Sequence, residues 1–177
     1  MQYSSFIILY SPNMIPKKFQ SFLEKLKIAV KPVAHKTVYT AYDLAQTLKV
    51  KLSQIAKTVV LKVEPPIEEG GKKYKHVLAV LGAHQNLDLG KLKKMLKLKK
   101  IDIDRENTMA KLFKIKPGAI TPFSAFHKVP VVIDKGLLKA KELIAGSGSF
   151  TESVKVKTKD LVKAGGKAVG VFGKKRK

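Results

Sequence analysis

Three short segments carry residue types that could bind an anion or an acyl group. In the first, Lys57 and Thr58 lie among the apolar residues Ile55, Val59 and Val60. Lysine is almost never buried without a partner, so an ammonium in these surroundings can point into a cleft and receive an anion. The alternative is a lysine at a sheet edge whose charge reaches solvent, and this segment alone favours that alternative.

The second segment is KPGAITPF, residues 116–123, in which Gly118 and Pro122 bracket a short stretch. Glycine permits a close approach or a positive φ, and proline fixes the direction in which the chain leaves. Such a loop could form a rigid wall for the amino acid moiety of a ligand. An ordinary surface loop is the commoner case.

The third segment is Gly146-Ser147-Gly148. Backbone N–H groups of such residues can converge on an anion or on a developing oxyanion, and Ser147 adds a hydroxyl. A flexible linker has the same composition. The segment lies between two predicted strands, which makes a linker the less natural interpretation.

Several chemistries are excluded by the sequence. There are no cysteines, so thiolate nucleophiles, disulfides and cysteine-bound metals are absent. Zinc-helix, calcium-loop, phosphate-loop, dinucleotide and nucleophile-elbow motifs are also missing. Asp102 and Asp104 share a strand face, but solvated acids at a strand edge are more common than a catalytic pair. We therefore expect no metal and no cofactor, and treat the four histidines as surface or hydrogen-bonded residues: His35, His76, His84 and His127.

The strongest bulk signal is charge. Lys and Arg number 36 and Asp and Glu 13, which leaves a formal net charge of +23 on 177 residues. Such an excess attracts polyanions through counterion release. Lysine dominates over arginine, which favours phosphate attraction over bidentate base reading. A lysine-rich proteome is the alternative explanation, and we interpret the charge as favouring a nucleic-acid partner.

Hydrophobic patterns predict a mixture of helices and strands. Amphipathic spacing predicts a helix over residues 16–26, and Thr40 and Asp88 begin two further helices. The intermixed order predicts an α+β (mixed α/β) domain with a largely central sheet. Further predicted elements are strands over 29–38, 55–63, 76–81, 101–104, 129–134 and 154–156, a turn-rich tip over 65–73, a helical stretch over 105–113 and a short helix capped by Thr158.

The N-terminal stretch does not have the pattern of a signal peptide or a membrane span. The apolar run at residues 6–10 is too short to span a bilayer and lacks a preceding positive charge. We therefore expect a cytoplasmic protein that does not contact membranes. The basic segment 173–177 is expected to be a flexible tail.

Six segments in order resemble the YbaK/ProX (prolyl-tRNA synthetase-associated) editing family. They run from about Ala34 to Leu161 and comprise AHKTVYTAYDLA, IAKTVVLKV, VLAVLGAHQNLDLGKL, PGAITPF, VPVVID and LIAGSGSF. The resemblance implies one editing domain over residues 1–172, with a central mixed, partly barrel-like sheet flanked by helices. It also implies a deacylase that acts in trans on mischarged tRNA without a metal.

The resemblance carries roles to particular residues. It implies Lys57 as the key functional residue, with Thr58 and Ser147 also catalytic. It implies six substrate-binding positions: Tyr39, Gly118, Ala119, Pro122, Gly146 and Gly148. Thr37 falls near the same pocket. Many relatives have a second glycine where this chain has Ala119, and a Thr-Gly near Phe113-Lys114, so the amino acid substrate is less defined than the reaction.

These observations lead to one hypothesis and two alternatives. Lys57 would hold the terminal phosphate or the ester carbonyl, and the 146–148 loop would orient the ester for attack by water or by the vicinal ribose hydroxyl. The substrate would be tRNA carrying a small amino acid such as Cys, Ala or Ser, with an aminoacyl-tRNA synthetase as a possible partner. The alternatives are a non-catalytic RNA-binding module and a protein that binds or hydrolyses a small anionic metabolite.

Overall fold

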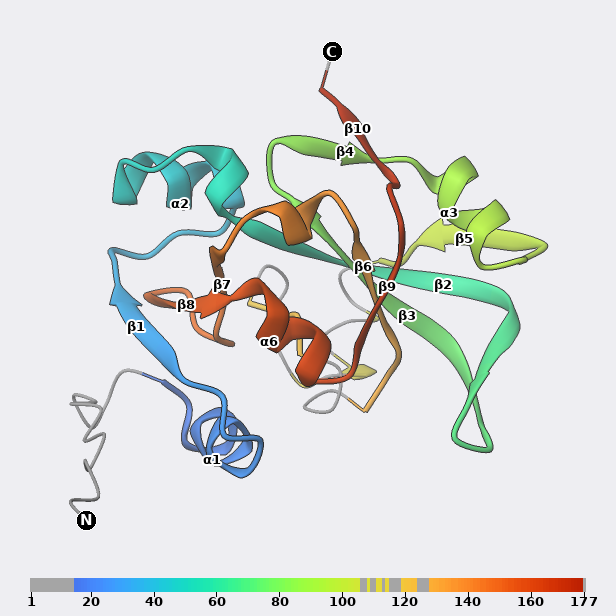
Figure 1. The fold of residues 1–177 in the computed structure, drawn as a ribbon, viewed down its shortest axis with the longest axis horizontal. Helices are drawn as coiled ribbons and strands as arrows, with labels where there is room; N and C mark the ends of the chain where they lie inside the picture. The colour runs from blue at the N-terminus through green and yellow to red at the C-terminus, as the bar shows by residue number, and fades with distance from the viewer. Residues whose placement is uncertain are drawn as a thin grey trace.

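The structure, a computed structural model, describes residues 15–105, 108, 111, 112, 114, 119–123 and 128–176 (Figure 1). The helices are α1 (Lys17–Lys25), α2 (Ala41–Leu48), α3 (Leu89–Met95) and α6 (Thr158–Lys163), with 3-10 turns η1 (Leu52–Gln54) and η2 (Leu137–Lys139). The strands are β1 (Val30–Ala34), β2 (Ala56–Glu69), β3 (Lys72–Gly82), β4 (Gln85–Leu87), β5 (Lys100–Ile103), β6 (Val131–Asp134), β7 (Glu142–Gly146), β8 (Glu152–Lys157), β9 (Gly166–Gly170) and β10 (Gly173–Lys175).

A five-stranded mixed sheet forms the centre, in the order β5-β2-β3-β6-β9. β2 and β3 form a long antiparallel hairpin whose turn is Gly70-Gly71, and β5 pairs antiparallel with the outer edge of β2. β6 pairs parallel with β3, and β9 pairs parallel with β6. The prediction of a mixed sheet is therefore confirmed, whereas closure into a partial barrel stays a prediction.

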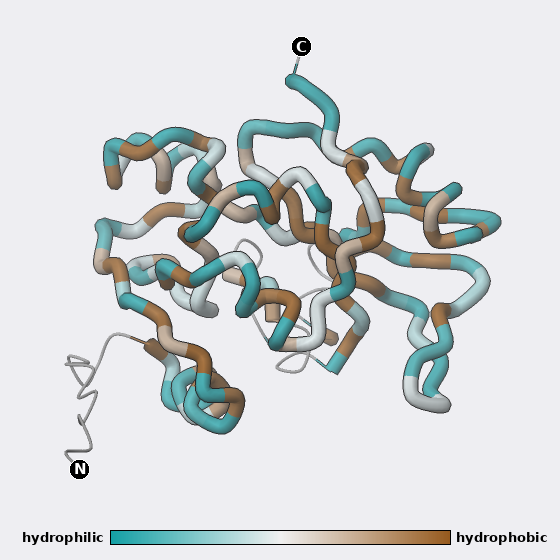
Figure 2. Tube along the Cα trace, viewed as in Figure 1, coloured by the Kyte–Doolittle hydropathy of each residue, from teal (hydrophilic) through white to brown (hydrophobic). Residues whose placement is uncertain are grey.

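Both faces of this sheet are covered, which explains the continuous apolar run in β3. Leu78 and Val80 face one hydrophobic cluster, while Val77, Ala79 and Leu81 face another, and all five are fully buried. Side chains alternate between the faces of a strand, so a strand buried on both faces must be apolar at every position. Figure 2 shows this hydrophobic band along the central strands and polar residues at the tip of the hairpin.

Two smaller sheets flank the central one. β1, β8 and β7 form an antiparallel sheet, and β10 pairs antiparallel with β4. A single parallel bridge between Ile55 and Ile144 connects the start of β2 to β7. This bridge brings the Lys57 region beside the 146–148 loop, although the two are about ninety residues apart in sequence.

Local capping explains where two of the helices begin. The Thr40 hydroxyl accepts the N–H of Asp43 at the start of α2, and the Asp88 carboxylate accepts the N–H of Lys91 at the start of α3. Both caps confirm the predictions. For the last helix the prediction was wrong: Thr158 is the first helical residue, and its hydroxyl donates to the backbone carbonyl of Ala140.

The extents of several predicted elements change in the structure. β2 continues to Glu69, so the turn at the hairpin tip is shorter than the predicted 65–73. Asp104 is not a solvated acid, because its side chain is only 9% exposed and lies 2.9 Å from Nε2 of His76. Most of the helical stretch predicted over 105–113 lies outside the described residues. None of the helices that the structure describes is long and apolar enough to cross a membrane.

The C-terminal segment corrects the prediction of a flexible tail. Residues 173–175 form β10, and the preceding Phe172 is fully buried in the core. The buried carboxylate of Asp134 accepts the backbone N–H groups of Phe172 and Gly173, each at 2.6 Å. A glycine- and lysine-rich sequence resembles a linker, and here long-range pairing and one buried acceptor make it a strand.

Candidate active site

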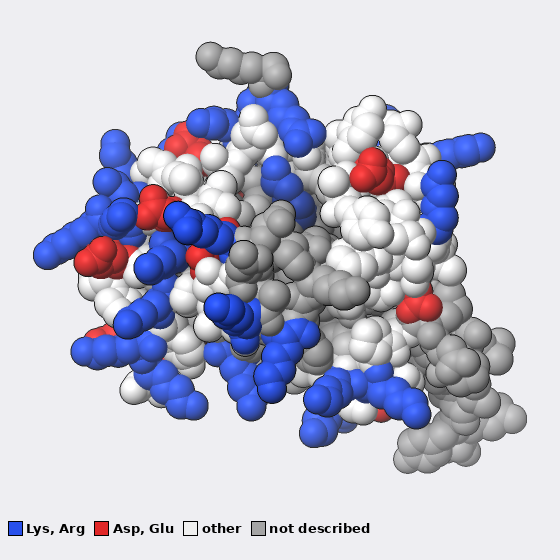
Figure 3. All heavy atoms as spheres, turned by 180° about the vertical axis from the view of Figure 1, so that it is seen from behind, with Lys and Arg blue, Asp and Glu red and all other residues white. Residues whose placement is uncertain are grey.

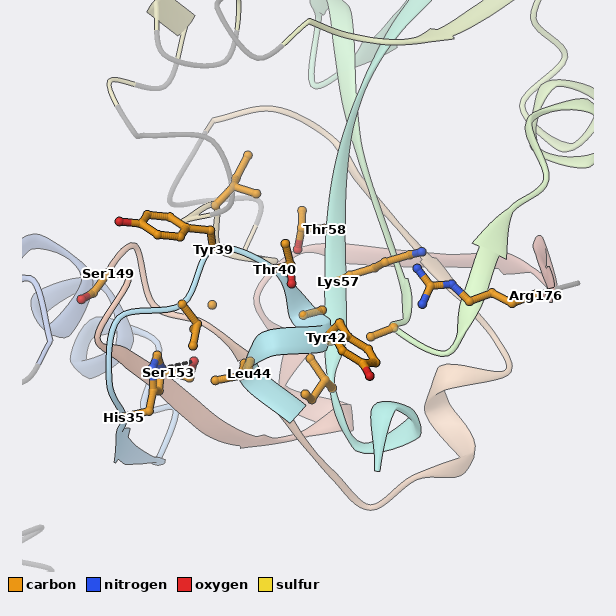
Figure 4. Close-up of a pocket in the computed structure, with 17 residues that line it drawn as sticks. His35, Tyr39, Thr40, Tyr42, Leu44, Lys57, Thr58, Ser149, Ser153 and Arg176 are labelled. Atoms are coloured by element: carbon orange, nitrogen blue, oxygen red, sulfur yellow. Dashed lines mark hydrogen bonds between the residues drawn. The ribbon is translucent and has the colours of Figure 1, made fainter. Parts of the chain in front are cut away.

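A pocket of about 280 Å³ opens where β2 begins, β7 ends and the chain enters α2 (Figure 4). Its described lining contains Lys57, Arg176, His35 and several hydroxyl groups, and no carboxylate. Lys57 and Arg176 lie at one end, whereas His35 and Ser153 lie at the other. The pocket therefore has a cationic end (Lys57 and Arg176) and a neutral polar end (His35 and Ser153).

Lys57 is half-buried at the cationic end. Its ammonium donates a hydrogen bond to the backbone carbonyl of Gln85 at 2.5 Å. The pKa of Lys57 is lowered, first because burial disfavours the charged form and second because the Arg176 guanidinium is nearby. Within the described part of the chain, no carboxylate forms an ion pair with Lys57. Thr58 also lines the pocket, so the structure brings both residues of the Lys-Thr pair to the site.

Arg176 reaches the same end from the C-terminal strand, and sequence analysis did not single it out. Figure 4 shows its guanidinium beside the Lys57 ammonium. Its Nε donates to the side-chain oxygen of Asn86 at 3.5 Å. No local motif marks this residue, because its position depends on the pairing of β10 with β4.

The 146–148 loop contributes to the pocket differently from the sequence-based hypothesis. Gly146 lines the pocket, and a Cβ atom built on it would lie 2.8 Å from the carbonyl oxygen of Ile120. Gly148 has φ of +93°, a value that favours glycine. The Ser147 side chain is fully buried, does not line the pocket, and donates to the carbonyl of Glu152 at 2.7 Å. A catalytic role for Ser147 stays a prediction.

Only residues 119–123 of the predicted 116–123 loop are described, and one of them lines the pocket. Gly118 lies outside the described residues. Ala119 and Pro122 are buried and do not line the pocket, whereas Ile120 between them does. The close contact between the Ile120 carbonyl and Gly146 fixes this wall against β7. Roles for Ala119 and Pro122 in substrate binding stay predictions. Any such role would be indirect, by supporting Ile120, which lines the pocket.

At the neutral polar end, His35 and Ser153 form a hydrogen-bonded pair that sequence analysis missed. Nε2 of His35 lies 3.0 Å from the Ser153 hydroxyl, and Nδ1 lies 2.9 Å from the carbonyl oxygen of Lys36. A carbonyl oxygen only accepts hydrogen bonds, so Nδ1 carries a proton and, in the neutral ring, Nε2 accepts the Ser153 proton. This tautomer leaves a base directed at a hydroxyl inside the pocket.

Tyr39 lies on the rim of the pocket. It is 67% exposed, and its ring lies 5.1 Å from that of Phe150, measured between centroids. Tyr42, also exposed, lines the pocket from the first turn of α2. Thr37 does not line it. Among the described residues, no group of three or more His, Asp or Glu side chains could hold a metal ion.

Comparison with known proteins identifies the family of this chain. Residues 35–164 match the family model of the aminoacyl-tRNA editing domain. The chain belongs to this family, which is the YbaK/ProX family that the sequence resembles. The aminoacyl-tRNA editing domain contains Lys57, His35 and Ser153, whereas Arg176 and α1 lie outside the matched residues.

Individual relatives of the editing domain support the same assignment. The prolyl-tRNA editing protein ProX of Acetoanaerobium sticklandii is 26% identical over 145 residues, which cover 80% of this chain and 84% of that protein. The multifunctional Ser/Thr-tRNA deacylase ProXp-y of Escherichia coli K12 is 30% identical over 132 residues, 74% of this chain and 76% of that protein. A solved structure of a candidate trans-editing enzyme for prolyl-tRNA synthetase shares the fold, with a TM-score of 0.74, 21% identity and coverage of 94% of this chain and 99% of that one.

Proposed function

We propose that this editing domain is a trans-acting deacylase that hydrolyses the ester of tRNA carrying a small non-cognate amino acid, such as Cys, Ala or Ser. The observation that carries the proposal is the half-buried Lys57 ammonium, which faces a pocket whose described lining holds no carboxylate. A buried charge without a counter-ion is unfavourable unless a ligand supplies the opposite charge. The acylated end of tRNA supplies it.

Hydrolysis of this substrate needs positioning more than a strong nucleophile, because an aminoacyl ester is already activated. Water adds to the ester carbonyl carbon and passes a proton to the Ser153 hydroxyl, whose own proton moves to Nε2 of His35. The bond between the carbonyl carbon and the ribose oxygen then breaks, and that oxygen takes up the proton. The products are a free amino acid and tRNA with a free terminal hydroxyl, and no step requires a metal.

The wall beside Gly146 supports a small amino acid substrate. Ile120 packs closely against Gly146 of β7, so little space is left on this side of the pocket. A well-packed pocket distinguishes one methylene by about 1–3 kcal/mol, and a fixed wall adds a steric clash with larger side chains.

The basic surface supports tRNA as the partner. Lysine and arginine side chains cover much of the face in Figure 3 and outnumber the acidic ones, most densely on the half that carries α3, β5 and the β2–β3 hairpin. Such a surface binds phosphates with little sequence preference. We place this activity in the cytoplasm, where an aminoacyl-tRNA synthetase would be a natural partner.

A deacylation panel tests the proposal. The purified protein is incubated with tRNAs carrying Ala, Ser or Cys, and release of free amino acid is measured. We expect Lys57→Ala to lower kcat/KM by at least about 100-fold, because one positioned cation is removed from the site. The matched control is Lys62→Ala, an exposed lysine on the same strand, which should keep the wild-type rate.

The same panel distinguishes the alternatives. Binding of tRNA without release of amino acid would contradict the deacylase and support an RNA-binding module. Hydrolysis of free aminoacyl esters with no preference for tRNA would support a small-metabolite enzyme. Circular dichroism of each variant shows whether a lost rate reflects a lost fold.

A further inference from the structure

The cationic end of the pocket holds two positive groups where one would suffice to bind an ester carbonyl. Lys57 and Arg176 both line the pocket, and within the described residues neither forms an ion pair with a carboxylate. Their proximity is unfavourable by itself, since like charges repel. An arrangement of this kind is stable when an anion lies between the two groups.

The position of Arg176 is fixed by the backbone of the chain. β10 pairs with β4 in a register that sets Gly173 opposite Leu87 and Lys175 opposite Gln85. Immediately before β10, the Asp134 carboxylate holds the N–H groups of Phe172 and Gly173, and Phe172 fills the core. Arg176 is therefore the first residue beyond an anchored strand.

One short strand positions both cations. The backbone carbonyl of Gln85 in β4 accepts a hydrogen bond from the Lys57 ammonium. The side-chain oxygen of Asn86, also in β4, accepts a hydrogen bond from Nε of Arg176. The bond to Asn86 uses Nε, so the terminal nitrogens of the guanidinium, which Figure 4 shows near the Lys57 ammonium, remain able to bind an anion as a bidentate fork. The ammonium and this fork can then bind different oxygens of one tetrahedral anion.

We propose that Lys57 and Arg176 together bind one phosphodiester, the group that links the last two nucleotides of the acceptor end. This inference rests on the proposed function. The amino acid carboxyl is esterified in the substrate and carries no charge, so the nearest anion to the ester is that phosphodiester. Arg176 is thus a substrate-positioning residue outside the region matched by the editing-domain family.

Two minimal substrates isolate this contact. Aminoacyl-adenosine carries the ester and no phosphate, whereas aminoacyl-cytidylyl-adenosine adds one phosphodiester. We expect Arg176→Ala to lower kcat/KM for the dinucleotide by about 10- to 100-fold, the effect of one charged hydrogen-bonding group. For aminoacyl-adenosine, kcat/KM of the variant should stay within about 2-fold of wild type. Arg176→Lys should recover part of the loss. The matched control is Lys175→Ala, which removes the same charge from the adjacent residue, outside the pocket lining.

The outcomes separate this inference from the proposed function. Equal losses on both substrates, no loss on either, or the same loss in Lys175→Ala would overturn the phosphodiester site while leaving the deacylase intact. If the wild-type protein hydrolyses no aminoacyl ester, the proposed function fails. Titration with unacylated cytidylyl-adenosine then still decides the inference: weaker binding in Arg176→Ala than in Lys175→Ala supports the site, and equal binding refutes it.

Discussion

The two ends of the pocket solve different physical problems. At the cationic end, Lys57 and Arg176 lie close together with no carboxylate in the described lining, and burial together with repulsion lowers the pKa of Lys57. At the neutral polar end, the His35 ring is held in one tautomer by the carbonyl of Lys36, and its second nitrogen is directed at Ser153. The cationic end is suited to binding an anionic group. The neutral polar end is suited to moving a proton.

This contrast predicts that variants at the two ends should fail in different ways. Removing Arg176 should lower the rate only on substrates that carry the phosphodiester. Removing the proton relay should lower the rate on every substrate to the same extent. The predictions below test that difference, from the largest expected effect to the smallest.

The largest effect is expected at the neutral polar end. Ser153→Ala removes the hydroxyl between water and His35, and we expect kcat to fall by about 100- to 10,000-fold on tRNA and minimal substrates alike. Ser149→Ala is the matched control, since Ser149 lines the same pocket and, among the described residues, its hydroxyl bonds only to Thr151. Single-turnover release of amino acid measures the chemical step.

A Ser153→Ala rate close to wild type would refute the relay. Attack would then be assisted by the substrate, through the vicinal ribose hydroxyl. A terminal 2′-deoxyadenosine would reveal that case, because it would lose the remaining rate.

The second effect concerns the anchor of the cationic end. Asp134→Ala leaves the buried N–H groups of Phe172 and Gly173, and the half-buried N–H of Gly136, without their acceptor. We expect a loss of about 3 kcal/mol in the free energy of unfolding, measured by urea denaturation. Asp102→Ala is the control, because its ion pair with Lys100 is exposed and should contribute less than about 1 kcal/mol. A loss in Asp134→Ala no larger than in this control would show that β10 is not anchored there.

The smallest effect is a shift in pH dependence. Activity that needs the Lys57 ammonium is present below its pKa and falls as pH rises through it. In Arg176→Ala the repulsion is removed while the burial remains, so the pKa of Lys57 rises and the alkaline limb of kcat/KM moves to higher pH. The profile is measured on aminoacyl-cytidylyl-adenosine, whose phosphodiester is the group that Lys57 is proposed to bind, and is corrected for hydrolysis without enzyme. An unmoved limb, or one that moves to lower pH, would show that the two charges are not coupled.

Sequence reasoning predicted those elements whose signals are local. The caps at Thr40 and Asp88, the amphipathic α1 and the apolar run in β3 follow from spacing and side-chain chemistry within a few residues. β9 and β10 were missed, because their sequence is rich in glycine and lysine and their pairing partners lie far away in the chain.

The same division holds for the candidate site. A lysine among apolar residues drew attention to Lys57, but only the resemblance to the editing family gave Lys57 and Thr58 a role, and both line the pocket. Ser147 was identified by a motif, but its hydroxyl donates to the carbonyl of Glu152. The motif does not determine which way this side chain points. Ser153 and Arg176 were missed, because only tertiary pairing brings them to the pocket.

The contact between Gly146 and Ile120 constrains how this protein could diversify. Any side chain at position 146 would collide with a backbone oxygen, which cannot rotate away as a flexible side chain could. Evolutionary change in substrate range is therefore open at the side chain of Ile120 and closed at Gly146. Among descendants of this gene, we expect the glycine to persist while the residue facing it varies.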